Sequence, residues 1–223
     1  MSIKEDYNAW ASTYDTNLNK TRDLEAQALR NVLQSRFQRA LEAGCGTGRN
    51  TSWLAAQCDE VVAVDFSANM LSVAKSRTNC DNVNFRELDL LAPWPFSESE
   101  FNLVVCSLVL EHIEDLDGVF SKVSHVLKSG GIFYIGELHP FKQYSGSKAR
   151  FGSPEDERIL TCHTHHVSSF FNAAAQAGLS YERLDEHFHE DDQGLPRGLR
   201  CCSESDLAIS PAFLSLGFVF NRN

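Results

Sequence analysis

The sequence predicts an α/β fold with a mostly parallel sheet, and three features of the chain point to it. Within residues 60–67 (EVVAVDFS), Val61, Val62, Ala63 and Val64 form a continuous, mostly β-branched run, typical of a strand that is buried on both faces. Such runs alternate with segments of helical periodicity between residues 37 and 139, the rhythm of right-handed strand–helix–strand units. Gly44, Gly46 and Gly48 follow the first apolar run and indicate a backbone that approaches another group closely.

Composition favours one globular domain. The chain has 223 residues, of which 43% are hydrophobic, and a formal net charge of −10, which suits a single domain of ordinary size. The acidic balance and the lack of a Lys/Arg run argue against nucleic-acid binding. We expect no membrane segment, because no stretch is apolar over a sufficient length. The polar N-terminus lacks a signal-peptide core, so a cytoplasmic location is expected.

The seven cysteines agree with that compartment, because they are odd in number and scattered along the chain. One segment, TCHTHH, places Cys162, His163, His165 and His166 together. Metal ligands have to converge in space, and neighbours in sequence rarely do. The sequence therefore predicts no metal site.

Hydrophobic periodicity predicts the elements in order. Helices are expected at about 3–14 and 23–36, before a strand that ends near Leu41. Helices at 51–57 and 68–76 then alternate with strands at 60–67, 83–88 and 101–107. Ser67 can cap the helix that follows it. A helix that starts near Leu116 is expected to end at Gly130, before a strand at 131–138.

The C-terminal third is less regular. Residues 140–166 show no clear period and are interpreted as a lid or substrate loop. A helix at 167–177 and strands at 181–188 and 212–220 follow, and the two strands are expected to pair antiparallel at the sheet edge. We divide a single domain, 1–223, into a helical cap (1–36), a cofactor-binding core (37–139), the lid or substrate loop (140–166) and a C-terminal helix with strands (167–223).

The spacing of the glycine loop excludes two kinds of phosphate site. A dinucleotide fingerprint requires Gly or Ala at the position that Arg49 occupies here. A P-loop requires Gly-Lys followed by Ser or Thr, and no such sequence follows the glycines.

Five motifs in order resemble the class I S-adenosylmethionine-dependent methyltransferases of the small-molecule type. They are EAGCGTG at 42–48, Asp65 at the end of the second strand, Asp89 after the third, LVLEHIED after the fourth, and LKSGGIFYIGE around the fifth. The resemblance implies a Rossmann-like doubly wound sheet with an antiparallel C-terminal edge hairpin. It also implies S-adenosylmethionine as the cofactor.

The resemblance assigns parts of the cofactor to particular residues. Gly44 and Gly46 would let the backbone lie against its methionine portion. Asp65 resembles the acid that accepts both ribose hydroxyls, as a carboxylate can. Asp89 resembles the residue that accepts the adenine amino group, with the Leu90 backbone nearby.

Six further positions complete the expected cofactor site. Phe66 and Met70 would sandwich the adenine ring, and Ser107 and Leu108 would lie near the methionine portion. Tyr14, in a Tyr-Asp pair before the core, resembles a residue that covers the cofactor in this family. Arg22 is either a partner of the cofactor carboxylate or a solvated charge at a helix end.

His112 and His139 are the candidate general bases, because both follow a strand at its carboxyl end, where open α/β sheets bind ligands. Glu111 and Glu137 are adjacent alternatives. The other interpretation is that His112 and Glu111 only shape the loop, because methyl transfer needs mainly alignment and exclusion of water.

The expected function is methyl transfer from S-adenosylmethionine to a small-molecule acceptor, without nucleic-acid or membrane partners. The alternative is a protein that binds S-adenosylmethionine without methyl transfer, as a regulatory or non-methylating relative.

Overall fold

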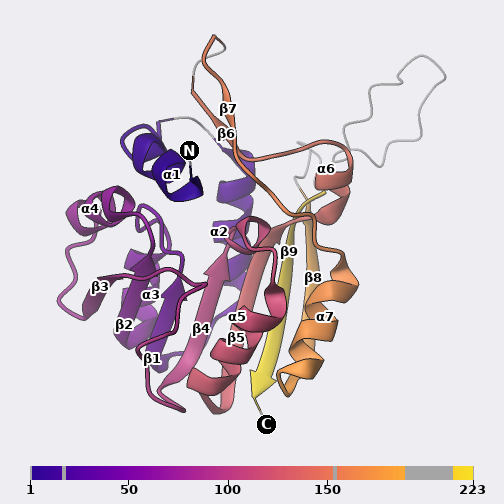
Figure 1. The fold of residues 1–223 in the computed structure, drawn as a ribbon. Helices are drawn as coiled ribbons and strands as arrows, with labels where there is room; N and C mark the ends of the chain where they lie inside the picture. The colour runs from indigo at the N-terminus through magenta and orange to yellow at the C-terminus, as the bar shows by residue number, and fades with distance from the viewer. Residues whose placement is uncertain (1, 17–18, 153–154, 189–212, 223) are drawn as a thin grey trace, which may run out of the picture.

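A seven-stranded sheet in the order β3-β2-β1-β4-β5-β9-β8 forms the centre of the computed structural model (Figure 1). The structure describes residues 2–16, 19–152, 155–188 and 213–222. Neighbours among the first five strands in that order pair in parallel, whereas β9 pairs antiparallel with both β5 and β8. The strands are β1 (Phe37–Ala43), β2 (Cys58–Asp65), β3 (Val83–Glu87), β4 (Phe101–Ser107), β5 (Leu127–Leu138), β8 (Leu179–Phe188) and β9 (Phe213–Arg222).

Helices cover both faces of this sheet, which confirms the doubly wound prediction. One face packs against α2, α3 and α4, and the other packs against α5 and α7. A small hairpin of β6 and β7 lies near α1 at the top of Figure 1. In the described residues, no helix has the length and apolar character to cross a membrane. The helices are α1 (Ile3–Trp10), α2 (Lys20–Val32), α3 (Thr51–Gln57), α4 (Ala68–Arg77), the short η1 (Leu110–His112), α5 (Leu116–Val126), α6 (Pro140–Tyr144) and α7 (Val167–Gln176); the hairpin strands are β6 (Arg150–Phe151) and β7 (Arg158–Ile159).

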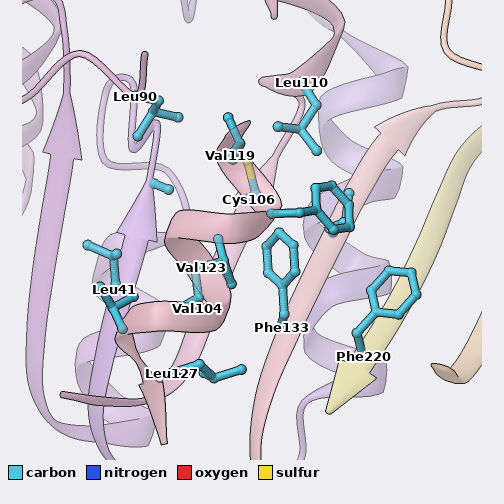
Figure 2. Close-up of a cluster of buried hydrophobic side chains, with 14 of the residues drawn as sticks. Leu41, Leu90, Val104, Cys106, Leu110, Val119, Val123, Leu127, Phe133 and Phe220 are labelled. Atoms are coloured by element: carbon cyan, nitrogen blue, oxygen red, sulfur yellow. The ribbon is translucent and has the colours of Figure 1, made fainter. Parts of the chain in front are cut away.

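The larger hydrophobic core lies between the sheet and α5 (Figure 2). Val123 of α5 faces Val104 of β4, and both side chains are almost fully buried. Beside them the ring of Phe120 packs edge-on against Phe133, with 5.2 Å between centroids. Burial of such side chains contributes about 1.5–3 kcal/mol each to folding. This core supports β4 and β5, whose carboxyl ends carry the site described below.

Several predicted boundaries are wrong, and the largest error concerns Gly130. The α5 helix ends at Val126, and β5 begins at once with Leu127. Phe101 of β4 pairs with Leu127, but Leu103 pairs with Ile132, so an irregularity in β5 accommodates the intervening residues. Gly130 lies in that irregularity with a φ of +72°, a conformation that glycine adopts at little cost. The glycine therefore bends a strand and does not end a helix.

Other differences are smaller. The first two helices end earlier than predicted, at Trp10 and Val32. The segment 140–166 contains α6 and the β6–β7 hairpin in addition to loop. The antiparallel C-terminal pair is confirmed, but of its two strands only β8 lies at an edge of the sheet, and β9 lies between β5 and β8. Ser67 caps α4 as predicted, since its hydroxyl accepts from the Met70 N–H at 3.1 Å.

The glycine loop supplies a matched pair of substitutions. Gly44 has a φ of +82°, and a Cβ added there would overlap Val109 in the loop after β4. Gly46 has a φ of +53°, but an added Cβ would meet no atom within 4 Å. Gly44→Ala should therefore lower the free energy of unfolding by about 2–4 kcal/mol, through backbone strain plus displacement of Val109, and Gly46→Ala by about 1 kcal/mol. Urea denaturation of the two variants measures the difference; equal losses would contradict the steric argument.

Candidate functional site

A cavity of about 170 Å³ lies at the carboxyl ends of the parallel strands, between the glycine loop, α1 and the loop after β4. It coincides with the site that the sequence predicts. With the exception of Met70, every predicted cofactor-contacting residue lines it, as does the candidate base His112. These residues are Tyr14, Arg22, Gly44, Gly46, Asp65, Phe66, Asp89, Leu90, Ser107 and Leu108.

Two predicted residues, Met70 and His139, are not among the cavity-lining residues. Met70 lies on the buried side of α4 with Leu71 and Ala74 and is 1% exposed. His139 caps α6: its Nδ1 accepts from the Phe141 N–H at 3.0 Å, and its Nε2 lies 2.9 Å from Glu186 Oε1. An imidazole that accepts at Nδ1 carries its proton at Nε2, so both nitrogens are engaged. The geometry therefore favours packing for Met70 and capping for His139.

Asp65 holds the glycine loop in place. The N–H groups of Gly44 and Cys45 both donate to the Val64 carbonyl, at 2.8 and 2.9 Å. The Gly46 N–H donates to Asp65 Oδ2 at 2.8 Å, and the Ser67 N–H donates to Oδ1 at 2.9 Å. Burial raises the pKa of Asp65, and these N–H donors act in the opposite direction. Each oxygen has room for a further donor from the cavity, because a carboxylate accepts about four hydrogen bonds.

Glu137 plays the corresponding part for the loop after β4. Its Oε1 accepts from the N–H groups of Val109 and Leu110, at 3.0 and 2.8 Å. Burial raises the pKa of Glu137 to about 8, and the nearby Glu111 adds to the shift. Leu108 is held with a φ of +55° and donates to the Gly136 carbonyl at 2.7 Å. Glu137, which the sequence offers as an alternative base, therefore accepts hydrogen bonds that fix the start of η1.

His112, at the end of η1, is hydrogen bonded at both ring nitrogens. Its Nδ1 lies 3.0 Å from the Thr161 carbonyl and its Nε2 lies 2.7 Å from the Tyr7 hydroxyl. A carbonyl can only accept, so Nδ1 carries the proton and Nε2 accepts from Tyr7. Burial raises the pKa of Tyr7 well above its usual value, which keeps that hydroxyl protonated. Glu111 Oε1 lies 3.8 Å from Nε2, where it would stabilise a protonated ring.

Tyr7 is the main site residue that the sequence analysis missed. It lies on α1, outside the strand-end motifs, and it lines the cavity. A usable signal existed, because Tyr7, Trp10 and Tyr14 are spaced as one face of a helix. In the structure these three rings pack together, with centroids 4.6–6.3 Å apart.

Segments distant in sequence meet above the cavity. The Trp10 ring of α1 stacks on Phe151 of β6, with centroids 5.1 Å apart and planes at 14°. Arg158 of β7 lies 4.0 Å from Asp6 of α1. His165 Nε2 lies 3.1 and 2.7 Å from the carbonyls of Leu110 and Ile113, and so braces η1. Within the residues described, no group of three or more His, Cys, Asp or Glu is arranged to hold a metal ion.

Comparison with known proteins agrees with this arrangement. Residues 41–135 match the sequence profile of a methyltransferase domain. The chain is 27% identical over 221 residues to an uncharacterized methyltransferase of Emericella nidulans, covering 81% of this chain and 77% of that protein. It is 25% identical over 169 residues to a ubiquinone biosynthesis O-methyltransferase of Methylococcus capsulatus, covering 68% and 70%. Three other curated relatives are matched over only 24–52% of their own length.

The fold is shared with solved structures. An S-adenosylmethionine-dependent methyltransferase from Mesorhizobium loti superposes with a TM-score of 0.68 at 21% identity, covering 88% of this chain and 96% of that one. At this identity the likeness concerns the fold.

Proposed function

We propose that the methyl acceptor of this S-adenosylmethionine-dependent methyltransferase is a small molecule and that His112 takes up the acceptor's proton. The observation that carries this proposal is the 2.7 Å hydrogen bond between Tyr7 and His112 on the wall of the cavity. It puts a proton-accepting nitrogen and an aromatic wall in the same cavity as the predicted cofactor site.

The cavity offers a chemical partner for each part of the cofactor. Asp65 suits the vicinal ribose hydroxyls, and Phe66 and Leu90 supply apolar surface for the adenine ring. The Arg22 guanidinium lines the cavity beside Tyr14 and Asp15 and supplies positive charge toward a carboxylate. At Gly46 an added Cβ would meet no atom within 4 Å, so a ligand can approach the backbone there. S-adenosylmethionine supplies an electrophilic methyl group on a sulfonium sulfur.

His112 and Tyr7 supply the proton chemistry of the proposal. Tyr7 donates to Nε2, so an acceptor hydroxyl or amine can give its proton to the Tyr7 oxygen while Tyr7 passes its own to His112. The Thr161 carbonyl holds the ring in this tautomer, and Glu111 is near enough to stabilise the imidazolium. A small acceptor also agrees with the name of the Methylococcus relative, a ubiquinone biosynthesis O-methyltransferase.

Asp65 is proposed to bind the ribose. Asp65→Asn should weaken binding of S-adenosylhomocysteine, measured by titration calorimetry, by about 1–3 kcal/mol, because the variant loses charged acceptors. Asp65→Ala should weaken it further, since the Gly46 N–H then also loses its partner. Asp59→Asn, at the exposed start of the same strand, is the matched control and should bind as the parent does. Parent-like binding by both Asp65 variants would remove the ribose role.

We further propose that the 3–22 region, through α1, and the 140–166 segment, through the β6–β7 hairpin, close over the bound cofactor. The contact of Trp10 with Phe151 and that of His112 with Thr161 support this closure. Hydrogen exchange with and without S-adenosylhomocysteine should show added protection in α1 and in the β6–β7 hairpin. The helix α7, of which no residue lines the cavity, should stay unchanged. Protection confined to the glycine loop would exclude a lid.

The two histidines should behave differently. His112→Ala should lower turnover by about a hundredfold or more at nearly unchanged cofactor affinity, and Tyr7→Phe should lower it less. His139→Ala should instead cost about 1 kcal/mol of stability, through loss of the cap on α6. Release of S-adenosylhomocysteine over a screen of acceptors is the measurement. Turnover that survives His112→Ala would leave alignment as the mechanism, and binding without turnover on every acceptor would favour the non-methylating alternative.

A further inference from the structure

We propose that Glu25 and Asn50 form a receptor for an ammonium group at one end of the cavity, and that it reads the amino group of the cofactor's methionine portion. Neither residue belongs to the strand-end motifs. Both line the cavity: Glu25 lies on α2, and Asn50 directly precedes α3.

Glu25 is a buried carboxyl that has only neutral hydrogen-bond partners. Its side chain extends to β5, where its carboxyl group occupies the space that a side chain at Gly136 would fill. The Tyr134 hydroxyl lies 3.4 Å from Oε1, and Asn50 Nδ2 lies 3.4 Å from Oε2. In the part of the chain that the structure describes, Glu25 forms no ion pair, although it is only 2% exposed. An ionised carboxylate in such a place is costly unless a cation joins it.

Asn50 adds an acceptor that lacks a partner. Its Nδ2 is shared between Glu25 Oε2 and Ser107 Oγ, which lies 3.3 Å away. Its Oδ1 is buried without a hydrogen-bond partner, and the residue is 7% exposed. Buried polar atoms are nearly always satisfied, so an orphaned oxygen in a cavity wall indicates a ligand donor.

An ammonium group fits this set better than a neutral donor. It brings three N–H groups to the Glu25 carboxylate and Asn50 Oδ1, and its charge compensates that of Glu25. Cationic side chains line the same cavity, since Arg22 and Arg49 are both present. A zwitterion can therefore place its carboxylate toward the arginines and its ammonium toward Glu25.

The pH dependence of binding follows from the free state. Burial raises the pKa of Glu25 to about 7, against the hydrogen bonds from Ser107, Asn50 and Tyr134 and the charge of Arg49. Glu42 of β1 is the nearby acid, and Cys106 of β4 also faces Glu25. A bound ammonium favours the ionised carboxylate, so binding releases a proton. The affinity should rise by up to about tenfold per pH unit below pH 7 and level off above it.

The test is a comparison of ligands on the full chain by titration calorimetry. The probes are S-adenosylhomocysteine and its analogue without the amino group. The parent should prefer the first by about thirtyfold or more, and Glu25→Gln should lose most of this preference while binding the analogue as before. Asn50→Ala should reduce the preference in the same direction, and melting temperatures show that each variant is folded.

Two controls can overturn the proposal. Glu42→Gln removes a second buried carboxyl of the same cavity, whose Oε2 already accepts from the Thr51 hydroxyl at 2.6 Å, and it should keep the preference. Loss of the preference in Glu42→Gln but not in Glu25→Gln would assign the ammonium to Glu42. If Glu25→Gln weakens S-adenosylmethionine but not S-adenosylhomocysteine, the carboxylate serves the sulfonium instead. These binding measurements need no methyl acceptor. They can therefore fail or succeed independently of the turnover experiments that test the role of His112.

Discussion

The cavity depends on one kind of interaction, a buried carboxylate at the end of a strand that accepts backbone N–H groups from a neighbouring loop. Asp65, at the end of β2, does this for the glycine loop after β1, and Glu137, in β5, does it for the loop after β4. Because β1 and β4 are adjacent in the sheet, both loops border the same space. Without these acceptors the N–H groups of two tight loops would be buried and unpaired, at a cost of about 1–3 kcal/mol each.

Buried carboxyl groups without a cationic hydrogen-bond partner also give the cavity its electrostatic character. Burial raises the pKa values of Glu25 and Glu42 to about 7 and 8. Their hydrogen-bond partners are neutral, and the charge of Arg49 offsets only part of the shift of Glu25. A cavity with under-compensated carboxyls favours ligands that carry positive charge. S-adenosylmethionine carries two such groups, a sulfonium and an ammonium, and this agrees with both the family and the proposed receptor.

His112 and His139 show how similar sequence positions acquire different surroundings. Both follow a strand at its carboxyl end, which is why both were predicted as bases. Hydrogen bonds from its backbone to Glu137 fix the loop after β4, and this loop places His112 against Tyr7 of α1. The chain after β5 instead starts α6, and His139 becomes its cap. The position of each histidine after its strand does not show whether it lines the cavity or caps a helix. The direction in which the chain continues, into η1 or into α6, decides this.

The sequence alone determined the α/β class, the order of the main strands and helices outside residues 140–166, and many of the residues that line the cavity. These follow from local patterns, since buried parallel strands need apolar runs and the glycine loop needs residues free at positive φ. Tyr7 and Glu25 were not found, because α1 and α2 reach the cavity by packing across the sheet ends; the spacing of Tyr7 and its aromatic neighbours marks a helix face but not what that face meets. Asn50, directly after the glycine loop, was not found because its contacts with Glu25 and Ser107 join distant segments. The irregularity at Gly130 and the insertion of β9 between β5 and β8 were decided in the same way, by strand pairing between distant segments.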